Sequence, residues 1–183
     1  MKTRRKKVIA KTQGIAWEFH PVYHHDKRIQ TMIMGAKEDI KRMGFHMVYV
    51  HDPRGTIPVF AYTIGLTLKR CLEVLVYGLP GNTSLDVLTT VYHRMLEKAY
   101  KPGRMDYVRI FEDRLANFKI IHPSQIPAHF QFGKYVLEAV YERKMTARPY
   151  QLFWTDKDGY FPWDSNCDPE IVRFQPLLYE EKK

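Results

Sequence analysis

Cysteine is nearly absent from this sequence, which contains only Cys71 and Cys167 among its 183 residues. Secreted domains held together by disulfides use many more cysteines, so two isolated thiols favour a reducing compartment, and we expect a cytoplasmic protein. Long hydrophobic runs are also missing, because the longest apolar stretches, 47–50 and 74–77, have only the length of a strand. A membrane-spanning helix needs roughly 20 apolar residues, so we expect no membrane association and no export signal.

The common catalytic motifs are absent as well. The sequence has no G-x-x-x-x-G-K phosphate loop, no G-x-G-x-x-G turn, no H-E-x-x-H, no C-x-x-C and no G-x-S-x-G. These motifs carry phosphate, dinucleotide, zinc, dithiol and acyl-transfer chemistry, respectively. Their absence moves the common nucleotide hydrolases, zinc proteases, dithiol enzymes and esterases out of the leading candidates. We expect no cofactor and no bound metal.

Positive charge is in excess and is unevenly placed. The chain has 29 Lys and Arg against 20 Asp and Glu, a net charge of +9, and residues 1–11 hold six basic residues and no acidic one. The remaining 172 residues therefore carry only +3. Apolar residues make up 45% of the sequence and aromatic residues 14%, which is enough for a core without disulfides or metal. We expect a flexible basic arm over residues 1–12 and a single domain over residues 13–183.

Hydrophobic periodicity predicts helices and strands in a mixed order. Apolar residues recur every three or four positions over 29–43, which predicts an amphipathic helix that ends at Gly44. A second helix is predicted to begin at a cap on Thr83 or Ser84, and a third to cover about 128–143. Apolar runs predict strands at 45–50, 59–64, 72–77, 107–111, 118–121 and 150–155. Hairpins mixed with helices are typical of the α+β class, so we expect a mixed or antiparallel sheet with about three helices in one compact domain.

Two segments with histidines are weak candidates for a site. The segment 20–26 has three histidines and an aspartate, which are ligand types for a transition metal, but Pro21 and the neighbouring charges favour a solvated loop. His51 and Asp52 end a predicted strand, where a histidine beside a carboxylate can act as a general base. Because Pro53 follows them, we favour a turn formed by the aspartate with a surface histidine beside it.

Stronger candidates lie in the last third of the chain. His122 follows an apolar strand and is held in a fixed direction by Pro123, which makes it the best candidate for a general base. Residues 151–164 alternate aromatic side chains with carboxylates across a tight turn. These side chains are Phe153, Trp154, Phe161, Trp163, Asp156, Asp158 and Asp164. They form either a core with an acidic turn or the wall of a ligand pocket, and we favour the core.

Four segments of the chain carry a family likeness. They are Phe60-Ala-Tyr-Thr-Ile-Gly-Leu66, Leu72-Glu-Val-Leu-Val-Tyr-Gly-Leu-Pro80, His122-Pro-Ser with Phe132-Gly133, and Leu152-Phe-Trp-Thr-Asp156 through Phe161-Pro-Trp-Asp164 to Gln175-Pro-Leu-Leu178. On these segments the chain resembles the bacterial and phage family known as domain of unknown function 4262, from about Gly44 to Leu178. The resemblance implies a shared fold and no particular activity.

The sequence departs from the family pattern in three places. The family tends to have Gly-His-Pro-Glu-Leu before the third strand, whereas this chain has Lys69-Arg-Cys-Leu-Glu73, so the histidine is missing. The family's Trp-Pro-Asp appears as Trp154-Thr155-Asp156. The basic arm and residues 13–27 look like an addition to the family core.

Three functions remain open. We favour a binding protein of bacterial or phage type that holds a small ligand, for example a nucleotide, or a protein partner in an aromatic and acidic pocket. Its predicted lining is Tyr62, Thr63, His122, Trp154, Asp156 and Trp163. The first alternative is a hydrolase in which His122 works with Asp156 or Asp164, although we lean away from enzymatic activity. The second is a nucleic-acid binder that uses basic residues of the predicted helix over 92–101 together with the arm residues Arg4, Arg5, Lys6 and Lys7.

Overall fold

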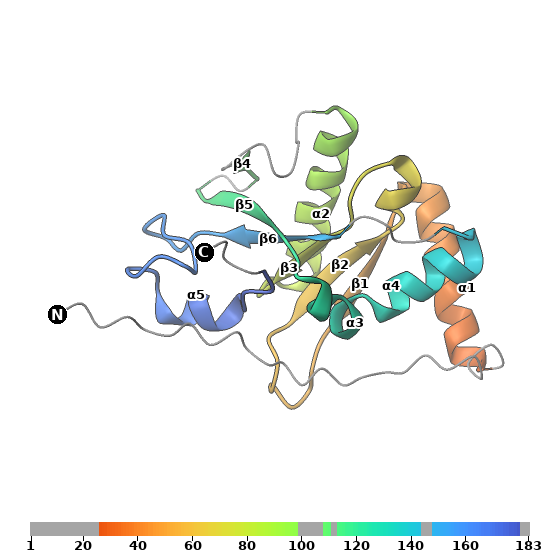
Figure 1. Cartoon of the computed structure of the whole chain (residues 1–183), viewed down its shortest axis with the longest axis horizontal. Coiled ribbons are helices and arrows are strands. Elements are labelled where there is room, and N and C mark those ends of the chain that lie inside the picture. Colours follow the sequence, from red (N-terminus) through yellow and green to blue (C-terminus); the bar gives the residue numbers. More distant parts are fainter. Residues whose placement is uncertain (1–25, 99–107, 111–112, 144–147, 180–183) are drawn as a thin grey trace.

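A computed structural model describes residues 26–98, 108–110, 113–143 and 148–179; the basic arm and the histidines of segment 20–25 lie outside these ranges (Figure 1). In chain order the elements are α1 Lys27–Met43, β1 His46–Val50, β2 Phe60–Ile64, η2 Leu66–Lys69, β3 Val74–Tyr77, α2 Gly81–Leu96, β4 Val108–Arg109, β5 Leu115–Ile120, η3 Pro123–Gln125, α3 Ile126–His129, α4 Gln131–Tyr135, η4 Val136–Val140, β6 Tyr150–Trp154 and α5 Pro169–Phe174. Of these, η2 and η3 are 3-10 turns and η4 is a π-helical turn. None of the helices in these ranges is long and apolar enough to cross a membrane.

One mixed sheet organises the described residues. Its strands lie in the order β1-β2-β3-β6-β5-β4, and every neighbouring pair is antiparallel except β3 and β6, which are parallel. The parallel pair joins distant parts of the chain, because Val74 lies opposite Tyr150. The α+β class, the mixed sheet and the single compact domain predicted from the sequence are therefore confirmed.

The predicted hairpin of β1 and β2 is also confirmed, and its turn is held by Asp52. The strands pair without a bulge from His46 opposite Ile64 to Val50 opposite Phe60. The Asp52 carboxylate accepts hydrogen bonds from the backbone N–H of Arg54 (3.0 Å) and Thr56 (2.8 Å) and from the Thr56 hydroxyl. The hydrogen bond from that hydroxyl, followed by the one from the Arg54 N–H, lowers the pKa of Asp52 far below its ordinary value. This aspartate is a turn former, as favoured from the sequence, and His51 beside it is exposed.

Helix α1 follows the predicted stripe closely. The Asp26 carboxylate caps its first turn by accepting from the Arg28 N–H, and the helix buries Ile33, Ala36 and Ile40 against the sheet. The helix ends at Gly44, whose φ of 91° is in the left-handed region that favours glycine. Gly44 is required there for a second reason, because a Cβ at this position would lie 2.0 Å from the Tyr92 hydroxyl oxygen.

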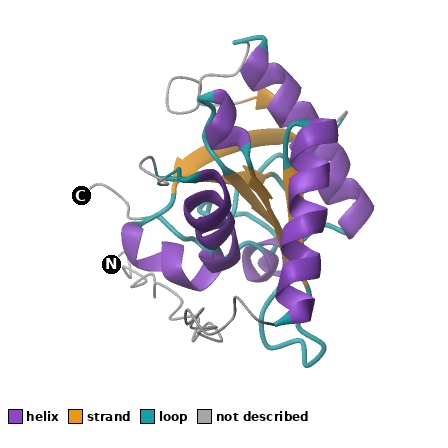
Figure 2. Cartoon of the chain, turned by 90° about the vertical axis from the view of Figure 1, so that its right-hand side faces the viewer, coloured by secondary structure: helices purple, strands orange, loops and turns teal. Residues whose placement is uncertain are grey.

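The sheet has a hydrophobic core on each face, and helices lie on both sides of the strands (Figure 2). On one face, α2 packs Leu88 and Val91 against inward residues of the strands such as Leu152. On the other, α1, α3, α4 and η4 pack against Tyr62 and Tyr77. Because successive side chains of a strand point to opposite faces, β1, β2 and β3 contribute to both cores, whereas β4, β5 and β6 contribute to the core under α2.

The predicted third helix differs from the structure. Residues 128–143 are not one helix: α3 ends at His129, α4 begins after Phe130, and the segment from Val136 to Val140 is π-helical. At Gly133 the backbone approaches the sheet so closely that a Cβ would lie 3.1 Å from the Tyr62 ring. Ala139, within the predicted range of this helix, is exposed. The predicted helix is therefore divided at Phe130 and changes to a π-helical turn at Val136.

Two helix starts also differ from expectation. Helix α2 begins at Gly81 after Pro80, not at a Thr83 or Ser84 cap, and the Ser84 hydroxyl instead donates to the Leu79 carbonyl at 3.2 Å. Helix α5 was not predicted, although Asp168 followed by a proline is a typical start signal. The Asp168 carboxylate accepts a hydrogen bond from the Glu170 N–H at 2.8 Å.

Candidate functional site

The Asp156 carboxylate lies inside the loop that follows β6 and is only 2% exposed. Its Oδ1 accepts from the backbone N–H of Asp158 (3.0 Å) and Tyr160 (2.8 Å), and its Oδ2 accepts from the N–H of Asp168 (2.9 Å). Burial raises the pKa of this carboxyl group, but the backbone donors more than offset burial and hold the pKa below its ordinary value. Asp156 therefore fixes the turn after β6 and ties it to the start of α5.

Replacing Asp156 with alanine is expected to lower the free energy of unfolding by about 2 to 3 kcal/mol, because three backbone N–H groups lose their acceptor. Urea unfolding followed by circular dichroism measures this change. The matched control is Asp158→Ala, whose exposed side chain should cost less than about 0.5 kcal/mol. An Asp156→Ala protein as stable as the wild type would show that the carboxylate is not needed to form the turn.

Trp154 lies beyond the residues of β6 that pair with β3, and the Gln175 side chain takes the place of a neighbouring strand there. The buried side-chain amide of Gln175 donates to the Trp154 carbonyl at 2.9 Å and accepts from its N–H at 3.0 Å, as a neighbouring strand would. The Gln151 amide does the same for the segment 176–178, donating to the Pro176 carbonyl and accepting from the Leu178 N–H. These two glutamines fasten residues 175–178 to β6, and we call that segment the C-terminal strap.

The six residues predicted to line one pocket do not meet in one place. Tyr62 is buried in the core under α1 and α4, whereas Trp154 is buried in the core under α2 and donates its indole N–H to the Tyr77 carbonyl. Thr63 is 1% exposed and bonds within the sheet. The register of these strands cannot be read from the sequence, so the residues of the two faces of the sheet were not told apart.

His122 and Asp156 are likewise kept apart. In the β5–β6 pair Ile120 lies opposite Tyr150 and Ala116 opposite Trp154, so the two residues flank opposite ends of the pair. At a rise of about 3.3 Å per residue, the separation is on the order of 20 Å, too far for the predicted hydrogen bond. The His122 ring instead caps η3: its Nδ1 lies 2.7 Å from the Ser124 hydroxyl and accepts from the Ser124 N–H at 3.3 Å.

Aromatic rings gather on the outer half of the sheet around a lysine. Trp163 stacks on Phe161 with ring centroids 4.6 Å apart, and meets Phe153 and Tyr179 at steep angles. The Lys119 Nζ lies 4.9 Å from the centre of the Trp163 ring and 5.9 Å from that of Tyr179. Phe153 and Phe161 are buried, whereas Lys119, Trp163 and Tyr179 are partly exposed. We call these last three residues the lysine–aromatic site.

Residues 39–168 match the sequence family described as Domain of unknown function (DUF4262). The chain belongs to this family. The resemblance inferred from the four segments is thus confirmed, and the family domain begins inside α1 and ends before α5. No curated protein and no solved structure matches the chain at a significant level.

A second buried carboxylate of the DUF4262 domain, Glu73, is not among the predicted site residues. Its Oε2 accepts from the Thr63 hydroxyl at 2.7 Å, and its Oε1 accepts from the N–H groups of Gly65 and Thr67, each at 3.0 Å. Burial raises the pKa of Glu73 more than these donors lower it. The sequence feature that could have indicated this site is the position of Glu73, an acidic residue inside the apolar run 72–77. Glu73 ties the end of β2 and the turn η2 to the start of β3.

His129 is a buried histidine with both ring nitrogens engaged. Its Nδ1 lies 2.7 Å from the Gln125 carbonyl oxygen, to which it donates, so its Nε2 accepts from the Tyr77 hydroxyl, also at 2.7 Å. Burial lowers the pKa of His129 and raises that of Tyr77, which in both cases favours the neutral form. The pair joins α3 to β3 within the DUF4262 core.

Neither a thiol nucleophile nor a metal cluster is formed in the described part of the domain. Burial and the nearby Asp156 carboxylate raise the pKa of the Cys167 thiol to about 11, and a protonated thiol is a poor nucleophile. Within the described ranges, no group of three or more His, Cys, Asp or Glu side chains is arranged to hold a metal ion. A hollow of about 450 Å³ lies on α1 among Glu38, Asp39, Lys41 and Arg42, away from the predicted residues.

Proposed function

We propose that this protein binds a small anionic ligand, with a nucleotide as the leading class, at the lysine–aromatic site of Lys119, Trp163 and Tyr179. The observation that carries the proposal is the state of the Lys119 ammonium group. Its only contacts within the described ranges are the two ring faces, at 4.9 and 5.9 Å, and no carboxylate there pairs with it. Trp163 belongs to the predicted lining, whereas Lys119 and Tyr179 were not predicted.

Physical chemistry supports an anion at this position. Ring faces attract an ammonium group and hold it in place, but they do not neutralise its charge or accept its N–H groups as oxygen does. As far as the described residues are concerned, the three donors of Lys119 are therefore available to a phosphate or carboxylate. Phe161 stacks on the Trp163 ring and Lys119 lies over it, so the partly exposed edges of Trp163 and Tyr179 are what offer apolar surface to the base of a nucleotide. Buried neighbours on the same face of the sheet, such as Phe153, keep the rings in place.

Intrinsic tryptophan fluorescence titrated with adenosine monophosphate and, separately, with inorganic phosphate tests the proposal. We expect saturable binding of the nucleotide by the wild type. Lys119→Met keeps the apolar stem on the rings and removes the charge, and it should weaken binding at least about tenfold, as the loss of one charge-assisted bond implies. Lys134→Met, an exposed lysine of α4, is the matched control and should leave affinity unchanged.

Two results would contradict the proposal. A titration without a saturable signal up to about 10 mM ligand, where binding free energy falls below about 3 kcal/mol, would remove a small-anion site. Equal affinities of Lys119→Met and wild type would place the ligand elsewhere on the molecule. The first result would turn attention from small ligands to a macromolecular partner.

We also propose that the protein is cytoplasmic and of bacterial or phage type. Both cysteines of the chain are free, which fits a reducing compartment. The bacterial or phage origin rests on the family resemblance alone.

A further inference from the structure

The excess positive charge lies mostly outside the DUF4262 domain. The 38 residues before the family match hold nine Lys and Arg against three Asp and Glu, a net charge of +6. The 130 matched residues hold 17 Lys and Arg against 14 Asp and Glu, a net charge of only +3. This chain therefore carries a family domain of low charge with a strongly basic extension, of which the first part of α1 is described.

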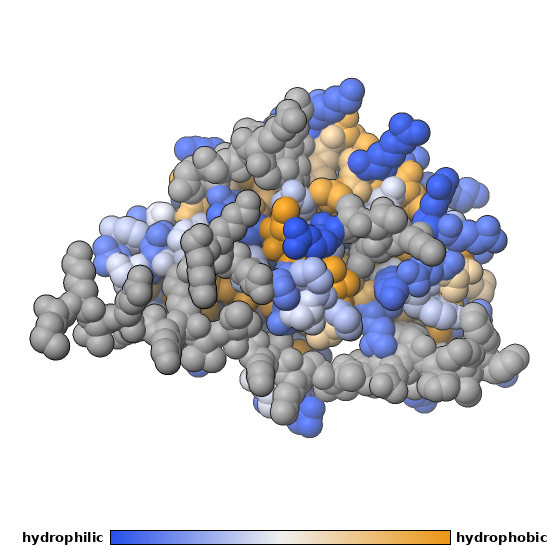
Figure 3. Space-filling model, viewed as in Figure 1, coloured by the Kyte–Doolittle hydropathy of each residue, from blue (hydrophilic) through white to orange (hydrophobic). Residues whose placement is uncertain are grey.

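Helix α1 turns its basic side chains to solvent. Its apolar stripe faces the sheet, and its five basic residues, all exposed, are Lys27, Arg28, Lys37, Lys41 and Arg42. In the space-filling view, hydrophilic residues cover much of the right-hand side, where α1 lies (Figure 3). The helix of 17 residues is about 25 Å long, so these cations are spread along a considerable length.

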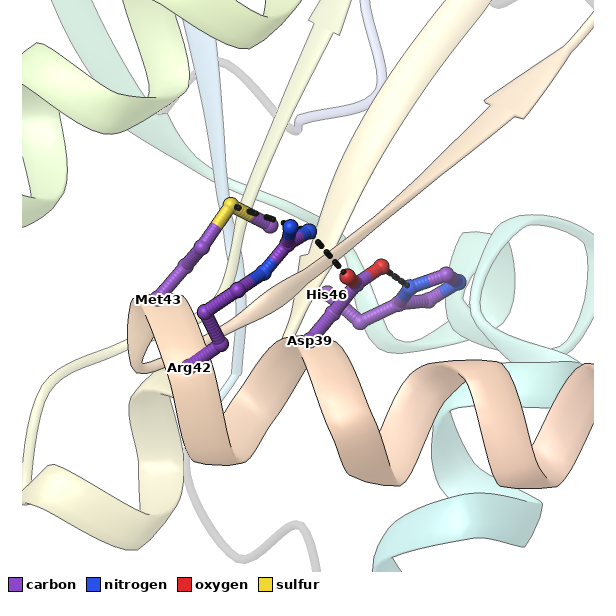
Figure 4. A network of polar contacts seen from close by, with 4 residues as sticks. All are labelled: Asp39, Arg42, Met43 and His46. Carbon is purple, nitrogen blue, oxygen red and sulfur yellow. Dashed lines mark hydrogen bonds and ion pairs between the residues drawn. The ribbon is translucent and has the colours of Figure 1, made fainter.

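Little of this charge is neutralised within the described part of the protein. Asp39 accepts from Arg42 at 2.9 Å and lies 2.8 Å from the His46 ring, so its two oxygens are already engaged (Figure 4). Within the described ranges, no ion pair involves the side chains of Lys27, Arg28, Lys37 or Lys41. Glu38 is the one exposed acid on the helix. The outer face of α1 is thus a row of cations available to a partner.

We propose that the outer face of α1 binds the phosphate backbone of a nucleic acid. A duplex carries one negative charge per about 1.7 Å of its axis, so it meets several cations of a 25 Å helix at once and releases its counterions. The carboxylates of an acidic protein are less densely spaced, and a polyanion of regular spacing suits this row better. Binding is expected to be independent of sequence, because phosphate contacts carry no sequence information.

Fluorescence anisotropy with a labelled 20-base-pair duplex, as DNA and as RNA, tests the proposal on the full chain. The variant Lys27→Gln, Arg28→Gln, Lys37→Gln, Lys41→Gln should weaken binding at least about tenfold and lower the slope of log affinity against log salt by about 3 to 4. The control variant Lys69→Gln, Lys134→Gln, Arg143→Gln, Lys157→Gln removes the same charge from exposed sites elsewhere and should lose less than about threefold. Circular dichroism verifies that both variants are folded.

The remaining arms of the experiment decide the outcome. Equal losses in the two variants would show that diffuse net charge attracts the duplex and would overturn the α1 surface. Poly-glutamate competing as well as the duplex at equal charge would overturn the nucleic-acid partner in favour of an acidic protein. Preference for the DNA or the RNA duplex identifies which nucleic acid is the partner, and deletion of residues 1–11 measures the contribution of the arm.

Discussion

Alanine in place of Gly44 is expected to lower the free energy of unfolding by about 3 kcal/mol or more, because two separate penalties combine. The first is conformational: φ is 91°, and an L-residue in the left-handed region costs about 1 to 2 kcal/mol. The second is steric. A Cβ would lie 2.0 Å from the hydroxyl oxygen and 2.5 Å from the Cζ of Tyr92, which is buried in the core under α2. Overpacking of this kind typically costs about 1 to 3 kcal/mol.

Gly55→Ala separates the two penalties. Gly55 has a φ of 65° but no heavy atom within 4 Å of the position of a Cβ, so only the conformational cost of about 1 kcal/mol applies. Urea unfolding of both variants gives the difference. In the double variant Gly44→Ala, Tyr92→Leu the steric part should be relieved, so the two changes should cost less together than the sum of their separate effects. A Gly44→Ala protein no less stable than Gly55→Ala would contradict the close contact between Gly44 and the Tyr92 ring.

Leucine in place of Glu73 is expected to cost about 3 to 5 kcal/mol, because it leaves the Thr63 hydroxyl and the N–H groups of Gly65 and Thr67 buried without an acceptor. Glutamine keeps the shape and one acceptor oxygen, so Glu73→Gln should be much less destabilising, by about 1 to 2 kcal/mol. Urea unfolding at one pH ranks the two variants. Equal stabilities of Glu73→Leu and Glu73→Gln would mean that the hydrogen bonds to the carboxylate contribute little.

The pH dependence of stability gives a second test of Glu73. Burial raises its pKa above the ordinary 4.5, so between the two values the folded protein binds more protons than the unfolded chain. Stability from this group is therefore fully present below pH 4.5 and declines as the pH rises through the folded-state pKa. Glu73→Gln cannot ionise and should remove this decline. The neutral His129 acts in the opposite direction, since its lowered pKa makes stability fall as the pH drops below 6.5, and that acid-side loss should persist in the variant.

Sequence patterns predicted the parts of the fold that depend on neighbours in the chain. The stripe of α1 with its terminal Gly44, the β1–β2 hairpin and the turn at Asp52 all follow from residues within a few positions of each other. The parallel contact of β3 with β6 joins Val74 to Tyr150, and no local signal specifies it. The break of the third predicted helix at Phe130 and its π-helical turn at Val136–Val140 were also not predicted from the sequence pattern.

The candidate site shows the same limit. Trp154 and Tyr62 are aromatic residues of the type that lines ligand pockets, but the register places them on opposite faces of the sheet. The acidic turn around Asp156 was visible in the sequence, whereas its three backbone donors were not. Lys119 was not predicted because its ring partners come from residues 163 and 179, well beyond its own strand.

The C-terminal strap has a consequence for the modularity of the family. Gln175 and Leu178 are buried in the strap, and Ile33 and Ala36 fill the core from α1, yet all four lie outside residues 39–168. A fragment cut at the limits of sequence similarity would expose the Trp154 ladder at one end and open the core under α1 at the other. The segment that sequence similarity delimits is therefore smaller than the unit that is packed around one sheet.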